Sequence, residues 1–149
     1  MSEQNRELVR RLNEEYHNQN RIHEVIQQQF APDFVNHSAP PGLPPTREGN
    51  EMFSIAFRQA FPDYQVTIHD VIVEGDRVVT RKTFTGTHRA GWMGVPASGR
   101  KICFGAIDIV RIANGKVVEH WAEFDIFTLL QQIGALPAPA PTGDEAGHG

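Results

Sequence analysis

The stretch "RKICFGAIDIVRIANGKVVEHWAEF", which runs from Arg100 to Phe124, decides the fold. Residues 100–112 and 116–124 are rich in β-branched and aromatic residues, which favour strands. The Asn-Gly pair between the two segments is the strongest short-range signal for a hairpin. The stretch therefore predicts two antiparallel strands joined by a tight turn.

Two further strands are predicted before this hairpin. Residues 64–75 alternate apolar and polar side chains in one phase before Asp70 and in the other phase after it. A change of phase within a strand predicts a β-bulge near Asp70. A turn at residues 74–77 leads to the next strand, at residues 78–88, so the second half of the chain predicts an antiparallel meander.

The first half of the chain has helical periodicity instead. Residues 3–17 and 21–29 predict two helices, and Thr46 is the predicted N-cap of a third, which ends at Pro62. A short last helix follows the hairpin, with Asp125 at its N-cap. Helices followed by a meander predict an α+β fold, a cone-shaped curved antiparallel sheet whose N-terminal helices close an internal pocket.

Composition limits the number of domains and the class of partner. The chain has 149 residues and a formal net charge of -4, and no basic face is evident, which argues against nucleic acid as a partner. We expect a single domain at residues 1–136 and a disordered Pro/Ala/Gly-rich tail at residues 137–149.

The compartment is inferred from what the sequence lacks. No apolar run reaches the roughly 18 residues that a membrane span needs, and the polar N-terminus does not resemble a signal peptide. A single cysteine, Cys103, cannot form an internal disulfide. We therefore expect a cytoplasmic protein that does not bind a membrane.

The stretch "VNHSAPPGLPPTREG" (Val35–Gly49) is a proline-rich loop, longer than the usual connection of about 4–6 residues. Prolines lower the entropy cost of ordering such a loop, so it is expected to form a stiff wall at the mouth of the pocket. His37, at the root of this loop, is predicted to point inward. The alternative is that His37 only bonds the loop to its own scaffold.

Asp108 stands in an apolar row of the predicted strand at residues 100–112. The row consists of Ile102, Phe104, Ala106, Asp108 and Val110. A buried carboxylate must find a partner or take a raised pKa, and a raised pKa suits a general acid–base. The alternative is a structural aspartate that pairs with Arg81 or Arg111.

His120 is the second polar residue in an apolar row, flanked by Val118 and Ala122. If residues 113–116 form a four-residue turn, Asp108 faces Trp121, and His120 lies on the other face of the sheet. A slip of one residue reverses this arrangement. The sequence therefore leaves open whether Asp108 and His120 share one pocket.

The other candidates are less specific. Trp92 and Met93 are expected to form an apolar lid over a ligand, with packing at the end of the sheet as the alternative, and aromatic residues are expected to line the pocket wall. These aromatic residues are Phe53, Phe57, Phe84, Phe104 and Trp121. The remaining histidines are expected on helix surfaces, outer strand positions, the rim or the tail: His17, His23, His69, His88 and His148. No metal-ligand spacing is present, so no metal site is predicted.

The motifs taken in order resemble the SnoaL-like polyketide cyclase family, also called ester cyclases, within the nuclear transport factor 2-like superfamily. The resemblance covers residues 7–136. Its segments are "HSAPPGLPPTREG", "AFPDYQVTIHDVIVEGDRVVTRKTFTGTH", "GVPASGRKICFGAIDIVRIANGKVVEHWAEFD" and "LLQQIGAL".

This resemblance implies a cofactor-independent intramolecular aldol ring closure on an aromatic polyketide ester. One aspartate acts as general acid–base in such enzymes, and Asp108 and Asp125 are the aspartates within or next to the last two strands. Polar neighbours such as His120 orient the substrate. The alternatives are an isomerase, an epoxide-hydrolase-like enzyme, or a non-catalytic ligand-binding or dimerisation protein.

The resemblance also implies the partners. We expect a small hydrophobic or aromatic ligand in the pocket, and a homodimer or higher homo-oligomer that forms through the outer face of the sheet. The apolar residues expected to be exposed on that face are Val71, Val73, Ile107 and Ile109.

Overall fold

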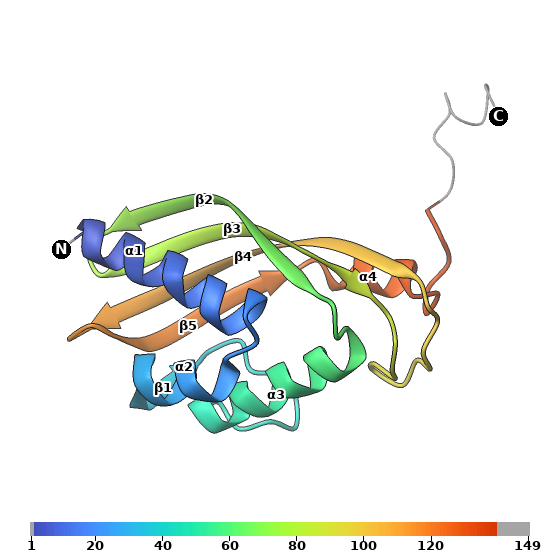
Figure 1. Cartoon of the computed structure of the whole chain (residues 1–149), viewed down its shortest axis with the longest axis horizontal. Helices are drawn as coiled ribbons and strands as arrows, with labels where there is room; N and C mark the ends of the chain where they lie inside the picture. Colours follow the sequence, from blue (N-terminus) through green and yellow to red (C-terminus); the bar gives the residue numbers. More distant parts are fainter. Residues whose placement is uncertain (1, 140–149) are drawn as a thin grey trace.

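The computed structural model describes residues 2–139, which form one five-stranded sheet with its helices (Figure 1). The elements are α1 (Ser2–Asn13), the π-helical turn η1 (Glu14–Asn18), α2 (Ile22–Gln29), β1 (Phe30–Asn36), α3 (Arg47–Ala60), β2 (Gln65–Glu74), β3 (Arg77–Thr87), β4 (Lys101–Ala113), β5 (Lys116–Phe124) and α4 (Ile126–Gln132). The fold is α+β, as predicted. Most of the tail predicted to be disordered, residues 140–149, lies outside the described residues.

The sheet has the strand order β1-β5-β4-β3-β2 and is mixed. Strands β2 to β5 form the predicted antiparallel meander, but β1 pairs with β5 in parallel. The prediction of a purely antiparallel sheet is therefore wrong, because β1 occupies a segment that was assigned to a helix end and a loop. Pro32 is tolerated there because β1 is an edge strand.

The predicted bulge in β2 is present. The register between β2 and β3 shifts between Ile68 and Asp70. Because of this shift, Val71 is buried in the core, and Val73 packs against it. The prediction that Val71 and Val73 lie on the outer face is therefore wrong, since the bulge turns both side chains inward.

The hairpin of β4 and β5 decides the question that the sequence left open. Asn114 and Gly115 both have positive φ, as the predicted turn requires. The register then shifts, and Val118 is the extra residue of β5. The pairs are Ile112 with Val117 beside the turn, and Val110 with His120 and Asp108 with Ala122 beyond the shift. Asp108 and His120 consequently lie on the same face of the sheet.

Helices α1, α2 and α3 lie over that face, as Figure 1 shows, and two groups of buried side chains fill the space beneath them. The first joins α1 and α2 to the end of the sheet where the β4–β5 turn lies. The second is largely aromatic and joins α3 and α4 to the opposite end. Within residues 2–139, no helix combines the length and the apolar character needed to cross a membrane.

Candidate functional site

A cavity of about 100 Å³ lies between the sheet and the helices α1, η1 and α3. Its apolar wall includes Val9, Leu12, Phe30, Phe53, Val110, Val117 and Phe124. Its polar groups are Asn13, Tyr16, His17, Asn50, Ser54, Lys82, Asp108 and His120. The structure therefore brings together Asp108, His120 and Phe53 of the predicted site residues.

Asp108 is the buried carboxylate of this cavity, with 7% of its surface exposed. Its Oδ2 lies 2.7 Å from Nζ of Lys82 and 3.6 Å from Nε2 of His120. Burial by itself raises the pKa of this carboxyl, but the charge of Lys82 and the contact with His120 outweigh it, so the pKa lies well below its ordinary value. The expectation of a raised pKa at Asp108 is therefore wrong.

The partner of Asp108 also differs from the expected arginines. Arg81 lies on the outer face and pairs with Asp70, while Arg111 pairs with Glu119. Because side chains alternate along a strand, both arginines lie on the opposite face of the sheet from Asp108. The counter-charge comes from Lys82 instead.

Lys82 was missed as a site residue, although the alternation along β3 points it inward. Thr80, Lys82 and Phe84 are all buried, and Lys82 is only 4% exposed. Its ammonium also donates to Oδ1 of Asn13 at 2.8 Å, and Asn13 Nδ2 donates to the carbonyl of Val9. This second bond fixes the Asn13 amide with its oxygen toward the lysine.

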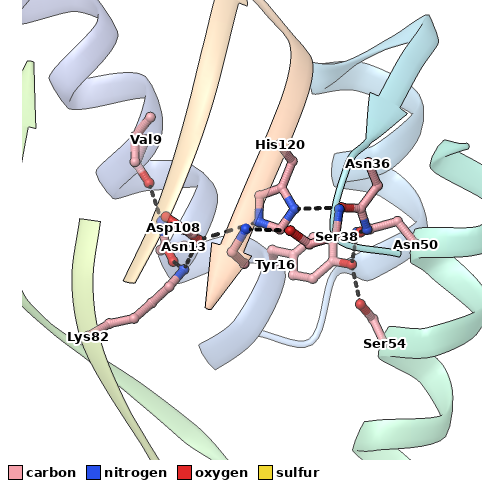
Figure 2. Close-up of polar contacts among 11 residues, drawn as sticks. Val9, Asn13, Tyr16, Asn36, Ser38, Asn50, Ser54, Lys82, Asp108 and His120 are labelled. Carbon is pink, nitrogen blue, oxygen red and sulfur yellow. Dashed lines mark hydrogen bonds and ion pairs between the residues drawn. The ribbon is translucent and has the colours of Figure 1, made fainter. Parts of the chain in front are cut away.

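His120 lies between Asp108 on one side and Asn36 on the other, as Figure 2 shows. Its Nδ1 is 3.0 Å from Oδ1 of Asn36. The same oxygen accepts the backbone N–H of Ser38 at 3.0 Å, which fixes the orientation of the Asn36 amide. Asn36 comes from β1, the strand that the sequence did not predict.

A chain of hydrogen bonds continues from Asn36 into α3 and η1 (Figure 2). Asn36 Nδ2 donates to Oδ1 of Asn50, and Asn50 Nδ2 donates to the hydroxyl of Tyr16. The Tyr16 hydroxyl also bonds to Oγ of Ser54. Burial raises the pKa of Tyr16 well above its ordinary value, so its hydroxyl is neutral at physiological pH.

His17 lines the cavity, which corrects the expectation that it lies at the surface or end of a helix. Its Nδ1 is 2.8 Å from the Tyr64 hydroxyl. Burial, and then the charge of Lys82, hold the pKa of His17 well below its ordinary range. The π-helical turn that carries His17 changes the phase of the helix, which explains why an ordinary helical period misplaces it.

His37 and Trp121 lie on the outer side of the sheet, which corrects their expected positions. Their rings stack with centroids 4.7 Å apart, and His37 Nε2 is 2.7 Å from Oε2 of Glu119. His37 points outward because Asn36 takes the inward position at this end of β1. Between residues 37 and 49, no side chain lines the cavity.

The remaining candidates lie near the cavity or away from it. Phe57, Phe84 and Phe104 belong to the aromatic core beside the cavity. Trp92 packs on Phe53 and Phe57, whereas Met93 is exposed, so Met93 is not part of a closed lid. Asp125 is the N-cap of α4, where it accepts the backbone N–H of Thr128 and stands outside the cavity wall.

The described part of the chain also bears on metal binding. Across residues 2–139, no group of three or more His, Cys, Asp or Glu side chains is placed to hold a metal ion. The polar groups of the cavity form instead a set of one ammonium, one carboxylate and two imidazoles, those of His17 and His120, together with neutral amides and hydroxyls. Such a set can bind a carbonyl compound and move a proton.

Comparison with known proteins adds the family. The sequence profile of the SnoaL-like polyketide cyclases matches residues 7–133. The chain belongs to this family. It is 28% identical over 145 residues to the aklanonic acid methyl ester cyclase DnrD of Streptomyces peucetius. The alignment covers 92% of this chain and 94% of DnrD.

Solved structures of Streptomyces proteins share the fold of this family member. AclR of Streptomyces galilaeus, for which hydroxylase activity has been suggested, superposes with a TM-score of 0.82 at 27% identity, covering 92% of this chain and all of AclR. TsrD of Streptomyces laurentii superposes with a TM-score of 0.76 at 31% identity, covering 87% and 94% of the two chains. The different assignments of these relatives mean that the fold alone does not fix the reaction.

Proposed function

We propose that this SnoaL-like polyketide cyclase closes a ring on an aromatic polyketide ester by an intramolecular aldol reaction, without a cofactor. The single observation that carries the proposal is the pair of Asp108 and His120, which face each other at 3.6 Å in an apolar cavity. A carboxylate and an imidazole in such surroundings form an acid–base pair. The similarity to DnrD supports an ester as the substrate.

The reaction needs one proton to leave and one to return. The acid–base pair removes a proton from the carbon next to a carbonyl, and the electron pair of that C–H bond remains as an enolate. The enolate carbon then forms a C–C bond with a second carbonyl of the same molecule. The resulting alkoxide takes up the proton, so the product is an isomer of the substrate and no oxidant is needed.

The size of the cavity limits how the substrate binds. An engineered cavity of about 150 Å³ holds one benzene ring. The cavity here measures about 100 Å³, so it must widen before one ring can enter. We therefore propose that only the reacting ring occupies the cavity, with the rest of the polyketide at its mouth.

The proposed function is tested with aklanonic acid methyl ester and with simpler aromatic polyketide esters. We expect a ring-closed product of unchanged mass, separated by chromatography and identified by NMR. Asp108→Asn should lower the rate by about 10²–10⁴-fold. Asp70→Asn is the matched control, because Asp70 pairs with Arg81 on the outer face. Binding of the esters without turnover would contradict the proposal and favour a non-catalytic ligand-binding protein.

We also propose a homodimer that forms through the outer face of the sheet. An apolar row crosses four strands there, with Ile72 paired to Val79, Val79 to Ile109, and Ile109 to Trp121. Charges of both signs flank the row, among them Asp70, Arg81, Arg111, Glu119 and Glu123. Because the face carries charges of both signs, a second copy of the same face can meet them with opposite charges, which supports a second copy of this chain as the occupant.

A further inference from the structure

We propose that His120, through Nε2, is the base that takes the substrate proton, and that Asp108 stays ionised and stabilises the imidazolium that forms. Asn36 is the positioning residue that holds the ring for this task. The inference rests on the proposed function, because it assigns the proton step of the ring closure to one atom.

Asp108 is a poor base because Lys82 stabilises its ionised form. Nζ of Lys82 lies 2.7 Å from Oδ2, and both side chains are buried, so little solvent screens the pair. The pKa of the carboxyl is accordingly held well below its ordinary value. A general base works best when its pKa lies near the operating pH, and among side chains imidazole meets this condition without a large perturbation.

The amide of Asn36 fixes which nitrogen of His120 carries the proton. Ser38 donates its backbone N–H to Oδ1 of Asn36, and a backbone N–H cannot accept a hydrogen bond. The atom of Asn36 that faces His120 is therefore its oxygen, and this oxygen needs a donor. Nδ1 of His120, 3.0 Å away, must supply the hydrogen. In the neutral ring, Nε2 is then left with a free lone pair.

This lone pair faces Asp108 across a gap of 3.6 Å. Neither Nε2 nor a carboxylate oxygen has a hydrogen to share, so the gap contains two acceptors and no donor. A proton placed on Nε2 satisfies both groups at once. The imidazolium would then have an acceptor on each side, Oδ2 of Asp108 and Oδ1 of Asn36, so the site is arranged for the state that follows proton transfer.

The charges around His120 balance during this step. The titratable groups that line the cavity with His120 are Asp108 from β4, Lys82 from β3, and Tyr16 and His17 from η1. Tyr16 is neutral because burial raises its pKa, and His17 is neutral because burial lowers its pKa. The positive charge of Lys82 and the negative charge of Asp108 cancel. When the C–H proton moves to Nε2, the positive imidazolium and the negative enolate appear together, and both charges vanish when the alkoxide takes the proton back.

The tautomer is tested without a substrate. Long-range proton–nitrogen NMR on protein labelled with ¹⁵N-histidine should show neutral His120 protonated at Nδ1. Asn36→Leu removes the acceptor and should give a mixture of tautomers, whereas Asn36→Asp keeps an acceptor oxygen and should retain the Nδ1–H form. A wild-type signal with the proton on Nε2 would overturn the inference.

The base is tested by the pH dependence of ring closure. We expect the acid limb of kcat/KM to follow the NMR titration of His120 and to move with it in Asn36→Asp. His120→Gln should cost about 10²–10⁴-fold in kcat, as expected for the loss of a general base. An acid limb that does not follow the His120 titration overturns this inference but leaves the proposed function standing. If no ester undergoes ring closure, the proposed function is overturned. The role of His120 as its base is then overturned too, even if the NMR shows the expected tautomer.

Discussion

Lys82 and Asp108 form a buried ion pair in the wall of the cavity, with 2.7 Å between Nζ of the lysine and Oδ2 of the aspartate. The two residues come from the adjacent strands β3 and β4 and lie diagonally across the ladder, since Thr80 is the direct partner of Asp108. Burying two charges is costly unless each is paired and hydrogen-bonded. Asn13 supplies the additional acceptor for the ammonium, so the pair keeps a fixed charge in the site.

Removal of the lysine should destabilise the fold. Lys82→Met leaves the carboxylate of Asp108 buried without its main counter-charge, and we expect a loss of about 3–5 kcal/mol in the free energy of unfolding. Urea denaturation at neutral pH measures this loss. Arg81→Met is the matched control, because its partner Asp70 is exposed, and it should change the stability by no more than about 0.5 kcal/mol. Equal effects of the two substitutions would contradict the importance of the buried pair.

The pH dependence of stability should report the same pair. The pKa of Asp108 is lower in the folded protein than its ordinary value of about 3.9, so below this value the unfolded chain binds more protons. The contribution of Asp108 to stability is therefore complete above about pH 4 and declines as the pH falls further. The Tm of Asp108→Asn, measured from pH 7 to pH 2, should lie below that of the wild type at neutral pH and approach it in acid. A constant difference would contradict this linkage.

Much of the site could be predicted from the sequence, but the part that depends on irregular backbone could not. Alternation placed Asp108 on an inward row, but its position relative to His120 depended on one extra residue, Val118, in β5. A bulge of this kind has no strict sequence signal, and one residue of shift moves a side chain to the other face.

The residues that were missed have local physical reasons. The burial pattern of β1 does not alternate strictly, and Pro32 weakens the strand signal, so Asn36 was assigned to a loop. His17 lies within a π-helical turn that changes the helical phase. Lys82 lay on an inward row of β3, but lysine is rarely buried unless it is paired, so the row alone did not identify it.

His17 should make the protein sensitive to mild acid. Because burial lowers its pKa, the unfolded chain binds more protons below the ordinary histidine pKa of about 6.5, and stability falls as the pH drops through this value. His17→Phe keeps an aromatic ring and removes the titration, although it also gives up the bond to Tyr64. We expect its loss of stability between pH 7.5 and pH 5, measured by urea denaturation, to be smaller than that of the wild type. His23→Phe, at an exposed position, is the control.

The proposed dimer should depend on the apolar residues of the outer face. Ile107 is 50% exposed there, next to the row that Ile109 and Trp121 form across β4 and β5. Ile107→Lys places like charges against each other at a two-fold interface and should shift the protein toward the monomer in light scattering. Met52→Lys, at an exposed position of α3 on the other side of the molecule, should leave the assembly unchanged. A wild-type monomer at high concentration would contradict the dimer.

Gly49 should connect the proline-rich loop to the chemistry of His120. A Cβ at this position would overlap the carbonyl oxygen of Pro44, and the next carbonyl, that of Pro45, accepts the backbone N–H of Asn36 at 2.9 Å. Gly49→Ala must therefore move the segment that holds Asn36, and we expect a loss of about 1–3 kcal/mol in stability.

Gly49→Ala should also change the tautomer of His120. Displacement of Asn36 weakens the bond to Nδ1 of His120, so Gly49→Ala should also raise the share of the Nε2-protonated tautomer in NMR and lower kcat. Gly105→Ala serves as the control, because a Cβ there meets only the carbonyl of Lys82 at 3.9 Å. A variant of Gly49 that loses stability while its His120 signal and kcat stay at wild-type values would show that the loop supports the fold without positioning the base.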